Sequence, residues 1–302
     1  MIPVLQIDQL VKDFGRIRAV NHLCLEVCEG SVFGLLGPNG SGKTTTLGII
    51  LDVIRKTSGQ YRWFGKESSQ LVRRNIGAIL EVPAFYPYLS ARRNLEVVAT
   101  IKGRGKENIE RIVEMTGLAE RIDDPYRTYS LGMKQRISIG AALLADPPVL
   151  ILDEPTNGLD PIGIAEIRQL IRQVASQGKT IILASHILDE VQKVCSHFAV
   201  LRKGSLVYTG SVIDVLDHDK DIVLAADDMD LLKHTLSEFA DMKHIVTEKD
   251  RITVSLNGST GPTELHRFLI ERGIVLSQLM VKKGSLEQKF LDILRESDAK
   301  NH

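Results

Sequence analysis

Short apolar runs alternate with longer amphipathic segments over the first two thirds of the chain. The runs lie at residues 32–36, 76–80, 149–152 and 180–183. Their length and continuous apolar character are typical of strands buried on both faces. The segment between the last two repeats apolar residues at helical spacing, at Ile164, Ile167, Leu170, Ile171 and Val174. Strands that alternate with helices predict an α/β fold with a mainly parallel sheet, whose ligands bind at the carboxyl ends of the strands.

Two other parts of this region have a different pattern. Residues 4–8 and 19–27 predict strands that precede the first buried run. Later, three helices are expected in succession, at residues 92–101, 107–115 and 132–145. A run of helices inside an otherwise alternating chain indicates a helical subdomain, at about residues 86–146.

The last third of the chain predicts a second, smaller domain. Seven aspartates between residues 214 and 230 mark a polar junction, so we expect one domain over residues 1–217 and another over 218–302. The second has the pattern strand, helix, strand, strand, helix, strand, which is the ferredoxin-like order of a small α+β fold. An amphipathic helix follows at residues 286–294. No catalytic pattern occurs in this domain, so we expect it to serve packing or dimerisation.

Composition excludes several classes of function. Lys+Arg and Asp+Glu both number 38, so no excess of positive charge favours a nucleic acid or an anionic membrane surface. No apolar run reaches the roughly 18 residues of a membrane helix, and the N-terminus lacks a signal-peptide pattern, so we expect a cytoplasmic protein. Cys24, Cys28 and Cys195 lack the partners of a zinc site, so free thiols are expected.

A glycine-rich loop follows the first buried run and precedes an apolar segment of helical character. It reads Gly37-Pro38-Asn39-Gly40-Ser41-Gly42-Lys43-Thr44, followed by Thr45. This is the pattern of a phosphate-binding loop, in which glycines let backbone N–H groups surround an anion at a helix start. Lys43 is expected to reach the β- and γ-phosphates, and the Thr44 hydroxyl to hold Mg²⁺. The alternative is a glycine-rich turn that binds nothing.

Two carboxylates end the buried run at 149–152. Asp153 comes first and is a candidate ligand of Mg²⁺, and Glu154 is a candidate base for an attacking water. Acidic residues after a strand can also be surface or helix-capping groups. The residues that follow, Pro155-Thr156-Asn157-Gly158-Leu159-Asp160-Pro161, make that alternative less favoured.

With these residues the sequence resembles the ATP-binding-cassette (ABC) ATPases, over residues 1 to about 215. The stretch from Leu152 to Pro161 is similar to the magnesium-binding strand, catalytic glutamate and dimer-contacting loop of that family. Tyr129-Ser130-Leu131-Gly132-Met133-Lys134-Gln135-Arg136 is similar to its signature motif, although Leu131 and Met133 depart from the commonest form. The resemblance implies a phosphate-loop NTPase fold with a helical subdomain.

The same resemblance assigns roles to further residues. It implies that Ser130 and Gly132 contact phosphate, that His186 contacts the γ-phosphate, and that Phe14 stacks on adenine with Val20 beside it. Glu81 stands where many members have a glutamine that touches Mg²⁺, and a carboxylate can serve as such a ligand. Residues 81–90 are similar to the corresponding stretch of bacitracin-, lantibiotic- and multidrug-type exporter ATPases.

The function that the resemblance implies is ATP hydrolysis by a transporter subunit, with ATP and Mg²⁺ as cofactors. The active sites would form in a head-to-tail dimer, either homodimer or heterodimer, in which one copy's phosphate loop faces the other's Ser130 and Gly132. Motion would pass to a separate membrane permease subunit, which would hold this chain on the cytoplasmic face of the membrane. The expected coupling surface is the loop at residues 81–90, with its aromatics Phe85, Tyr86 and Tyr88, together with the helical subdomain. A soluble non-transport ABC switch is the alternative.

Overall fold

The structure is a computed structural model, which describes residues 3–80, 85–218, 221–248, 250–256, 261–282, 286–287, 289–291 and 293. The described residues form two compact units, one up to Ser211 with Ile293 and one from Val212 to Leu291. The boundary that the sequence pattern suggests, at 217/218, lies at the end of the helix that opens the second unit, α8 (Val212–His218). Each unit is described by itself.

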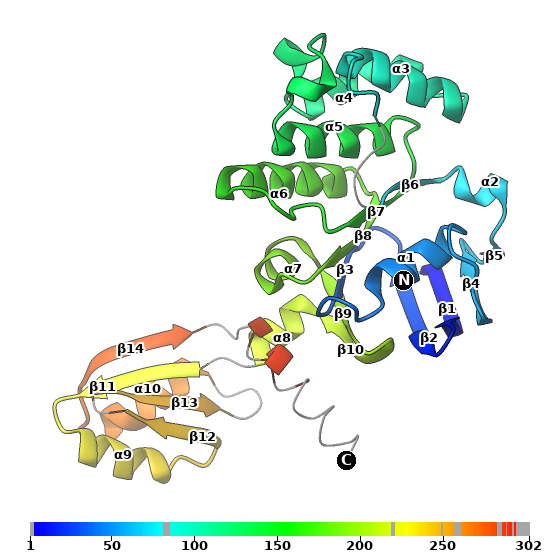
Figure 1. Cartoon of the computed structure of the whole chain (residues 1–302). Helices are drawn as coiled ribbons and strands as arrows, with labels where there is room; N and C mark the ends of the chain where they lie inside the picture. The colour runs from blue at the N-terminus through cyan, green and yellow to red at the C-terminus, as the bar shows by residue number, and fades with distance from the viewer. Residues whose placement is uncertain are drawn as a thin grey trace. The chain divides into compact units, whose positions relative to one another are not determined.

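The first unit contains two sheets (Figure 1). The larger has six strands in the order β10-β9-β3-β8-β7-β6, and all neighbours are parallel except β9 and β10. Its strands are β3 (Val32–Leu36), β6 (Ile76–Ile79), β7 (Val149–Asp153), β8 (Thr180–Ser185), β9 (His197–Arg202) and β10 (Ser205–Ser211). Every residue of β3, β7 and β8 is buried, as their apolar runs predict.

The smaller sheet is antiparallel and has the order β2-β1-β4-β5. Its strands are β1 (Pro3–Phe14), β2 (Ile17–Cys28), β4 (Ser58–Trp63) and β5 (Lys66–Glu67). One apolar core joins the two sheets and includes Leu47 and Ile50 of helix α1 (Lys43–Ile50). Trp63 is fully buried there, and its Nε1 donates to the carbonyl of Ile50 at 2.8 Å. The helix that follows the phosphate loop is therefore fixed to both sheets.

Helices cover the other parts of this unit. Three of them, α3 (Ala91–Lys102), α4 (Ile109–Met115) and α5 (Leu131–Leu143), lie together in Figure 1 as the expected helical subdomain. Short 3₁₀ turns join them at Lys106–Asn108, Ala119–Arg121 and Tyr126–Thr128. The remaining helices are α2 (Gln70–Arg73), α6 (Pro161–Ser176) and α7 (Leu188–Val194). No helix among the described residues is both long and apolar enough to cross a membrane.

The second unit is an antiparallel four-stranded sheet with two further helices. Its strand order is β12-β13-β11-β14. After α8 its elements are β11 (Asp221–Ala226), α9 (Met229–Ser237), β12 (Met242–Thr247), β13 (Ile252–Leu256), α10 (Pro262–Glu271) and β14 (Leu276–Lys282). This is the βαββαβ order expected from the sequence. Leu232, Leu236, Leu265 and Leu269 pack the helices against the sheet in a separate core. Of the amphipathic helix expected at residues 286–294, positions 286–287, 289–291 and 293 are described and helical, and Leu286 and Ile293 are buried.

Candidate active site

The phosphate loop, residues 37–42, connects β3 to α1 in a conformation that two of its glycines permit. A Cβ on Gly37 would lie 2.4 Å from the carbonyl oxygen of Leu201, which is far closer than two such atoms can approach. Gly42 has φ of 102°, and a Cβ there would lie 2.4 Å from the carbonyl oxygen of Ala19. The backbone can therefore pass close to β2 and β9 only because both residues lack side chains.

Lys43 opens α1, and its side chain turns back into the loop that precedes it. The residue is 5% exposed, and its Nζ donates to the carbonyl of Gly37 at 2.8 Å and to that of Pro38 at 3.3 Å. The same nitrogen lies 3.4 Å from Oε1 of Glu154. A buried cation at the start of a helix, where backbone N–H groups are unpaired, attracts a polyanion.

Glu154 follows β7 in a strained backbone conformation. Its φ of 46° places it in the left-handed region, which residues with a side chain rarely adopt. Two hydrogen bonds fix this turn: the N–H of Glu154 donates to Ala184 at 3.0 Å, and the N–H of Asn157 donates to Glu154 at 3.1 Å. Such strain costs about 1–3 kcal/mol and is found most often at functional sites. Here the residue in the strained conformation is the one whose carboxylate faces Lys43. Asp153, one residue earlier, is buried.

His186 supplies the third side chain of this cluster and comes from the end of β8. Its Nδ1 lies 2.7 Å from Oε2 of Glu154. The turn that carries it is held by Ser185, whose hydroxyl donates to Oε2 of Glu190 at 3.0 Å and accepts from the N–H of Ile187 at 3.0 Å. Ser185 and Glu190 are 0% and 2% exposed. This buried pair was not anticipated from the sequence; the only signal was a glutamate four residues after the histidine.

These groups line a pocket of about 430 Å³, which is within the range of small-molecule sites. Its lining residues are Phe14, Ala19, Asn39, Gly40, Ser41, Gly42, Lys43, Thr44, Thr45, Glu154, Asn157 and His186. Most of the candidate residues from the sequence thus meet in one place. Gly37 and Pro38 contribute through the carbonyls that accept from Lys43. Ala19 and Asn157 are additions that the sequence patterns did not single out.

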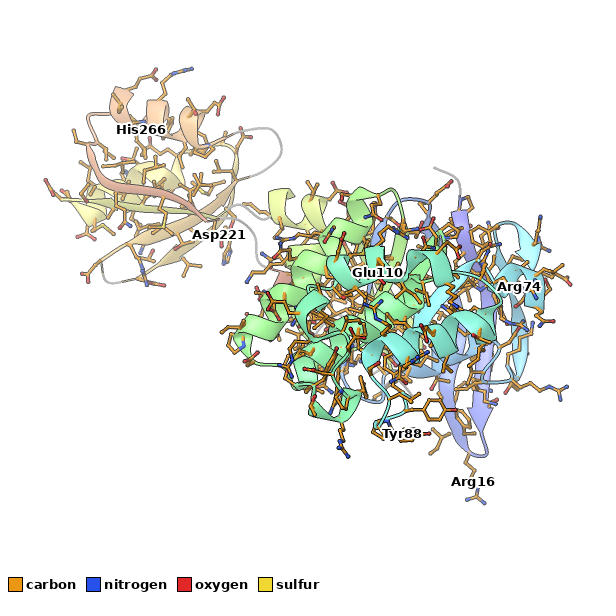
Figure 2. All side chains as sticks on the ribbon, turned by 90° about the horizontal axis from the view of Figure 1, so that it is seen from above. Arg16, Arg74, Tyr88, Glu110, Asp221 and His266 are labelled. Carbon is orange, nitrogen blue, oxygen red and sulfur yellow. The ribbon has the colours of Figure 1, made fainter. Side chains whose placement is uncertain are left out.

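Phe14 and Val20, the two residues expected beside the adenine, differ in their exposure to solvent. Phe14 ends β1 and is 49% exposed, and the Nζ of Lys12 lies 4.6 Å from its ring centroid. Its hairpin tip, with Arg16 outermost, projects from the first unit in Figure 2. Val20 is 0% exposed and packs in the core between the sheets. Because side chains alternate along a strand, Ala19 is the residue of β2 that faces the pocket instead.

The signature residues lie outside this pocket. Ser130 is the N-cap of α5, and its hydroxyl accepts from the N–H of Met133 at 3.3 Å. Gly132 is in the first turn of the same helix, next to Leu131, which is 50% exposed. The pocket of one chain therefore contains neither Ser130 nor Gly132.

The aromatic loop that precedes α3 is anchored by one buried side chain. Asn94 is 1% exposed. Its Oδ1 accepts from the N–H of Tyr86 at 2.7 Å, and its Nδ2 donates to the carbonyls of Tyr86 and Ser90, both at 3.0 Å. Tyr86 and Tyr88 are 48% and 68% exposed, with ring centroids 5.9 Å apart. Phe85 instead packs edge-on against Tyr126. Glu81 lies outside the described residues.

A larger hollow of about 610 Å³ lies on the antiparallel sheet, but its chemistry does not suit a phosphate. Its charged lining residues are Asp8, Glu26 and Arg62, and it contains no glycine loop or helix start. Acidic side chains there would repel a polyanion. The smaller pocket around Lys43 is therefore the nucleotide candidate.

Comparisons with known proteins identify the family of the chain. A family model described as ABC transporter matches residues 20–157. The bacitracin transport ATP-binding protein of Bacillus licheniformis is 36% identical over 301 residues, which covers 97% of this chain and 98% of that protein. The lantibiotic transport ATP-binding protein SrtF of Streptococcus pyogenes is 40% identical over 212 residues, covering 69% and 93%. A solved dimeric bacterial ABC transporter cassette matches with a TM-score of 0.62 at 26% identity, over 69% of this chain and 98% of that one.

Proposed function

The chain belongs to the ABC transporter family as an ATP-binding and ATP-hydrolysing subunit, and from this premise we propose that it binds Mg-ATP in the pocket around residues 37–45. The observation that carries the proposal is that Lys43 and His186 both contact the carboxylate of Glu154 beside the phosphate loop. The loop N–H groups, the start of α1 and Lys43 hold the phosphates. Phe14 stacks on the adenine, and Thr44 and Thr45 line the phosphate end of the pocket.

A magnesium ion fits the oxygen ligands at this end of the pocket. Mg²⁺ prefers hydroxyl and carboxylate oxygens. In this proposal the Thr44 hydroxyl supplies one from the pocket lining, and the buried carboxylate of Asp153, the residue before Glu154, supplies another. Glu81 is the third candidate from the sequence. When bound, the ion neutralises part of the charge that develops on the phosphates.

Three side chains of the pocket have separate roles in the proposed hydrolysis. Glu154 accepts a proton from the water that attacks the γ-phosphate, as a general base next to the reaction. His186 orients that carboxylate through the 2.7 Å contact and reaches the γ-phosphate from the end of β8. Lys43 stabilises the charge on the transferred group.

A second copy completes the site in this proposal. Ser130 and Gly132 head a 13-residue helix whose N-terminus is absent from the pocket of its own chain. That N-terminus is suited to a phosphate because of its unpaired N–H groups and dipole. A head-to-tail dimer, formed by two copies or by this chain with a related subunit, would bring it to the partner's γ-phosphate.

The membrane partner and the transported class follow from the relatives. Two relatives are named bacitracin transport ATP-binding protein and lantibiotic transport ATP-binding protein. These names support the inference that the partner is a permease that exports peptide antibiotics or similar molecules. The exposed pair Tyr86 and Tyr88 is a suitable surface for that permease. Docking there would place the chain at the cytoplasmic face of the membrane.

The test is hydrolysis by Glu154→Gln, which keeps the side-chain shape and removes the base. We expect turnover to fall by about 10²–10⁴-fold, with unchanged affinity for ATP and an ATP-dependent dimer that persists in sedimentation. Glu29→Gln, at an exposed position outside the pocket, is the matched control and should keep wild-type turnover. Wild-type turnover by Glu154→Gln would remove Glu154 from the role of base.

A further inference from the structure

A third pocket, of about 260 Å³, lies at the edge of the large sheet opposite the phosphate loop. Ile76 opens β6, and Ala145 and Pro147 precede β7, so all three are at the amino ends of strands. The phosphate loop follows the carboxyl end of β3 in the same sheet. The remaining lining residues are Gln70, Arg73, Arg74, Ile101, Lys102 and Arg104. The pocket thus joins α2 and β6 to the end of α3 in the helical subdomain.

The lining of this pocket is strongly basic. It contains four cationic side chains and no acidic one. Arg73 forms an ion pair with Asp52, and Arg104 donates to the carbonyl of Arg74. The nearby Asp146 is already shared between Arg111 and Lys179. Both of these carboxylates are therefore already paired, and the lining keeps a net positive charge.

Two of the cations are available to a ligand in different ways. Arg74 is exposed, and within the described residues its guanidinium makes no hydrogen bond or ion pair (Figure 2). Lys102 lies deeper, and its Nζ donates to the carbonyls of Ala141 and Ala142 at 3.0 and 3.2 Å. Burial and the nearby charge of Arg104 lower the pKa of Lys102 to about 8. An anion would offset both effects, because an opposite charge favours the protonated amine.

We propose that this pocket binds a small, multiply charged anion of the phosphate class, such as pyrophosphate or the phosphate group of a small metabolite. The planar donor forks of Arg74 and Arg104 suit two oxygens of a tetrahedral group, and Lys102 adds a point charge from the same lining. A single carboxylate could neutralise only one of these positive charges, whereas a multiply charged anion offsets more than one. The volume of about 260 Å³ suits a small ligand rather than a complete nucleotide. This site is separate from ATP hydrolysis.

A bound anion would connect two parts of the first unit, the segment after α2 and the end of α3. Arg74 follows α2, while Lys102 is the last residue of the helical subdomain's α3 and Arg104 follows that helix. A ligand that touches both sides would hold them together, and it would stabilise the folded protein by an amount that grows with the logarithm of its concentration once that exceeds the Kd.

The test is calorimetric titration of the full chain with pyrophosphate while the phosphate loop is saturated with Mg-ADP. We expect one site, and we expect Arg74→Glu to weaken binding at least tenfold because it replaces a charge-assisted contact with repulsion. Lys66→Glu, an equal change of charge in β5, is the control and should bind as the wild type does. Thermal unfolding verifies that both variants fold.

Two controls decide the assignment. Lys43→Ala should keep the pyrophosphate site, since that residue belongs to the other pocket. No heat of binding, or equal affinity in Arg74→Glu and wild type, would overturn the proposal. Flotation with vesicles of phosphatidic acid and phosphatidylcholine tests a lipid source for the same phosphate group. Vesicle binding that Arg74→Glu abolishes, without any pyrophosphate binding, would overturn the small-ligand assignment.

Discussion

Nδ1 of His186 lies 2.7 Å from Oε2 of Glu154, while the other oxygen of that carboxylate lies 3.4 Å from Nζ of Lys43. One carboxylate therefore joins three elements: the end of β7, the end of β8 and the start of α1. Its position depends on both neighbours, so substitutions at the three residues should not act independently.

We expect Lys43→Ala to weaken ATP binding itself. The ammonium is the one cation among the residues that line the pocket, and a charge-assisted contact contributes about 1.5–3 kcal/mol, or roughly ten- to a hundredfold in affinity. Calorimetry with Mg-ATP measures the change, and Lys66→Ala at an exposed position serves as the control. Unchanged affinity would count against the whole nucleotide assignment.

We expect the effects of His186→Ala and Glu154→Gln on turnover to be strongly non-additive. If His186 acts by orienting Glu154, its removal costs little once the base is absent, since residues that act as a unit share one effect. Single-turnover hydrolysis by the two single variants and the double variant gives the coupling. Additive losses would show that His186 acts on the phosphate alone.

Ser185→Ala should lower turnover about tenfold while ATP affinity stays unchanged. The hydroxyl that holds the turn before His186 is lost, and the buried Glu190 loses its hydrogen bond. Ser185→Thr keeps the hydroxyl and should restore most of the rate. The pH dependence of turnover distinguishes a misplaced histidine from a general loss of stability. If Ser185→Ala and Ser185→Thr lose turnover equally, the hydroxyl does not position His186.

The stability of the protein should rise with pH between about 8 and the ordinary lysine pKa near 10.5, through Lys102. The folded-state pKa of this amine is lowered, so the unfolded chain binds more protons in this window, and proton loss favours the folded state. Below about pH 8 the full cost of the buried charge is present. The slope should be absent in Lys102→Met. Parallel pH profiles of urea unfolding for the two proteins would contradict this prediction.

The parallel strands and the conformation of the glycine-rich loop could be predicted from the sequence because each rests on a local pattern. A fully apolar run such as 149–152 needs burial on both faces, and the glycines at 37 and 42 need a backbone without Cβ atoms. Asp153, which ends β7, and Glu154, which follows it, then mark the edge at which parallel sheets usually bind ligands. The membership of the ABC family confirms the fold that these patterns predict.

The sequence did not predict features that depend on which face of a strand a side chain occupies, or on contacts between residues far apart in the chain. Ala19 lines the pocket and Val20 packs in the core because the pleat of β2 directs them to opposite faces, and the bulges in the pairing of β2 with β1 obscure that alternation in the sequence. The left-handed turn at Glu154 is imposed by Ala184 from another strand. The basic pocket draws Arg74 and Lys102 from separate elements, so no stretch of sequence shows it.

Asn94 has a mechanical consequence for the aromatic loop. Its side chain bonds to the N–H and C=O of Tyr86 and to the carbonyl of Ser90, with little access for water. The backbone between these residues is therefore tied at both ends to the first turns of α3. A displacement of the Tyr86–Tyr88 pair would therefore move α3 as well, because the hydrogen bonds leave the loop little freedom to change its conformation. The loop transmits displacement instead of absorbing it.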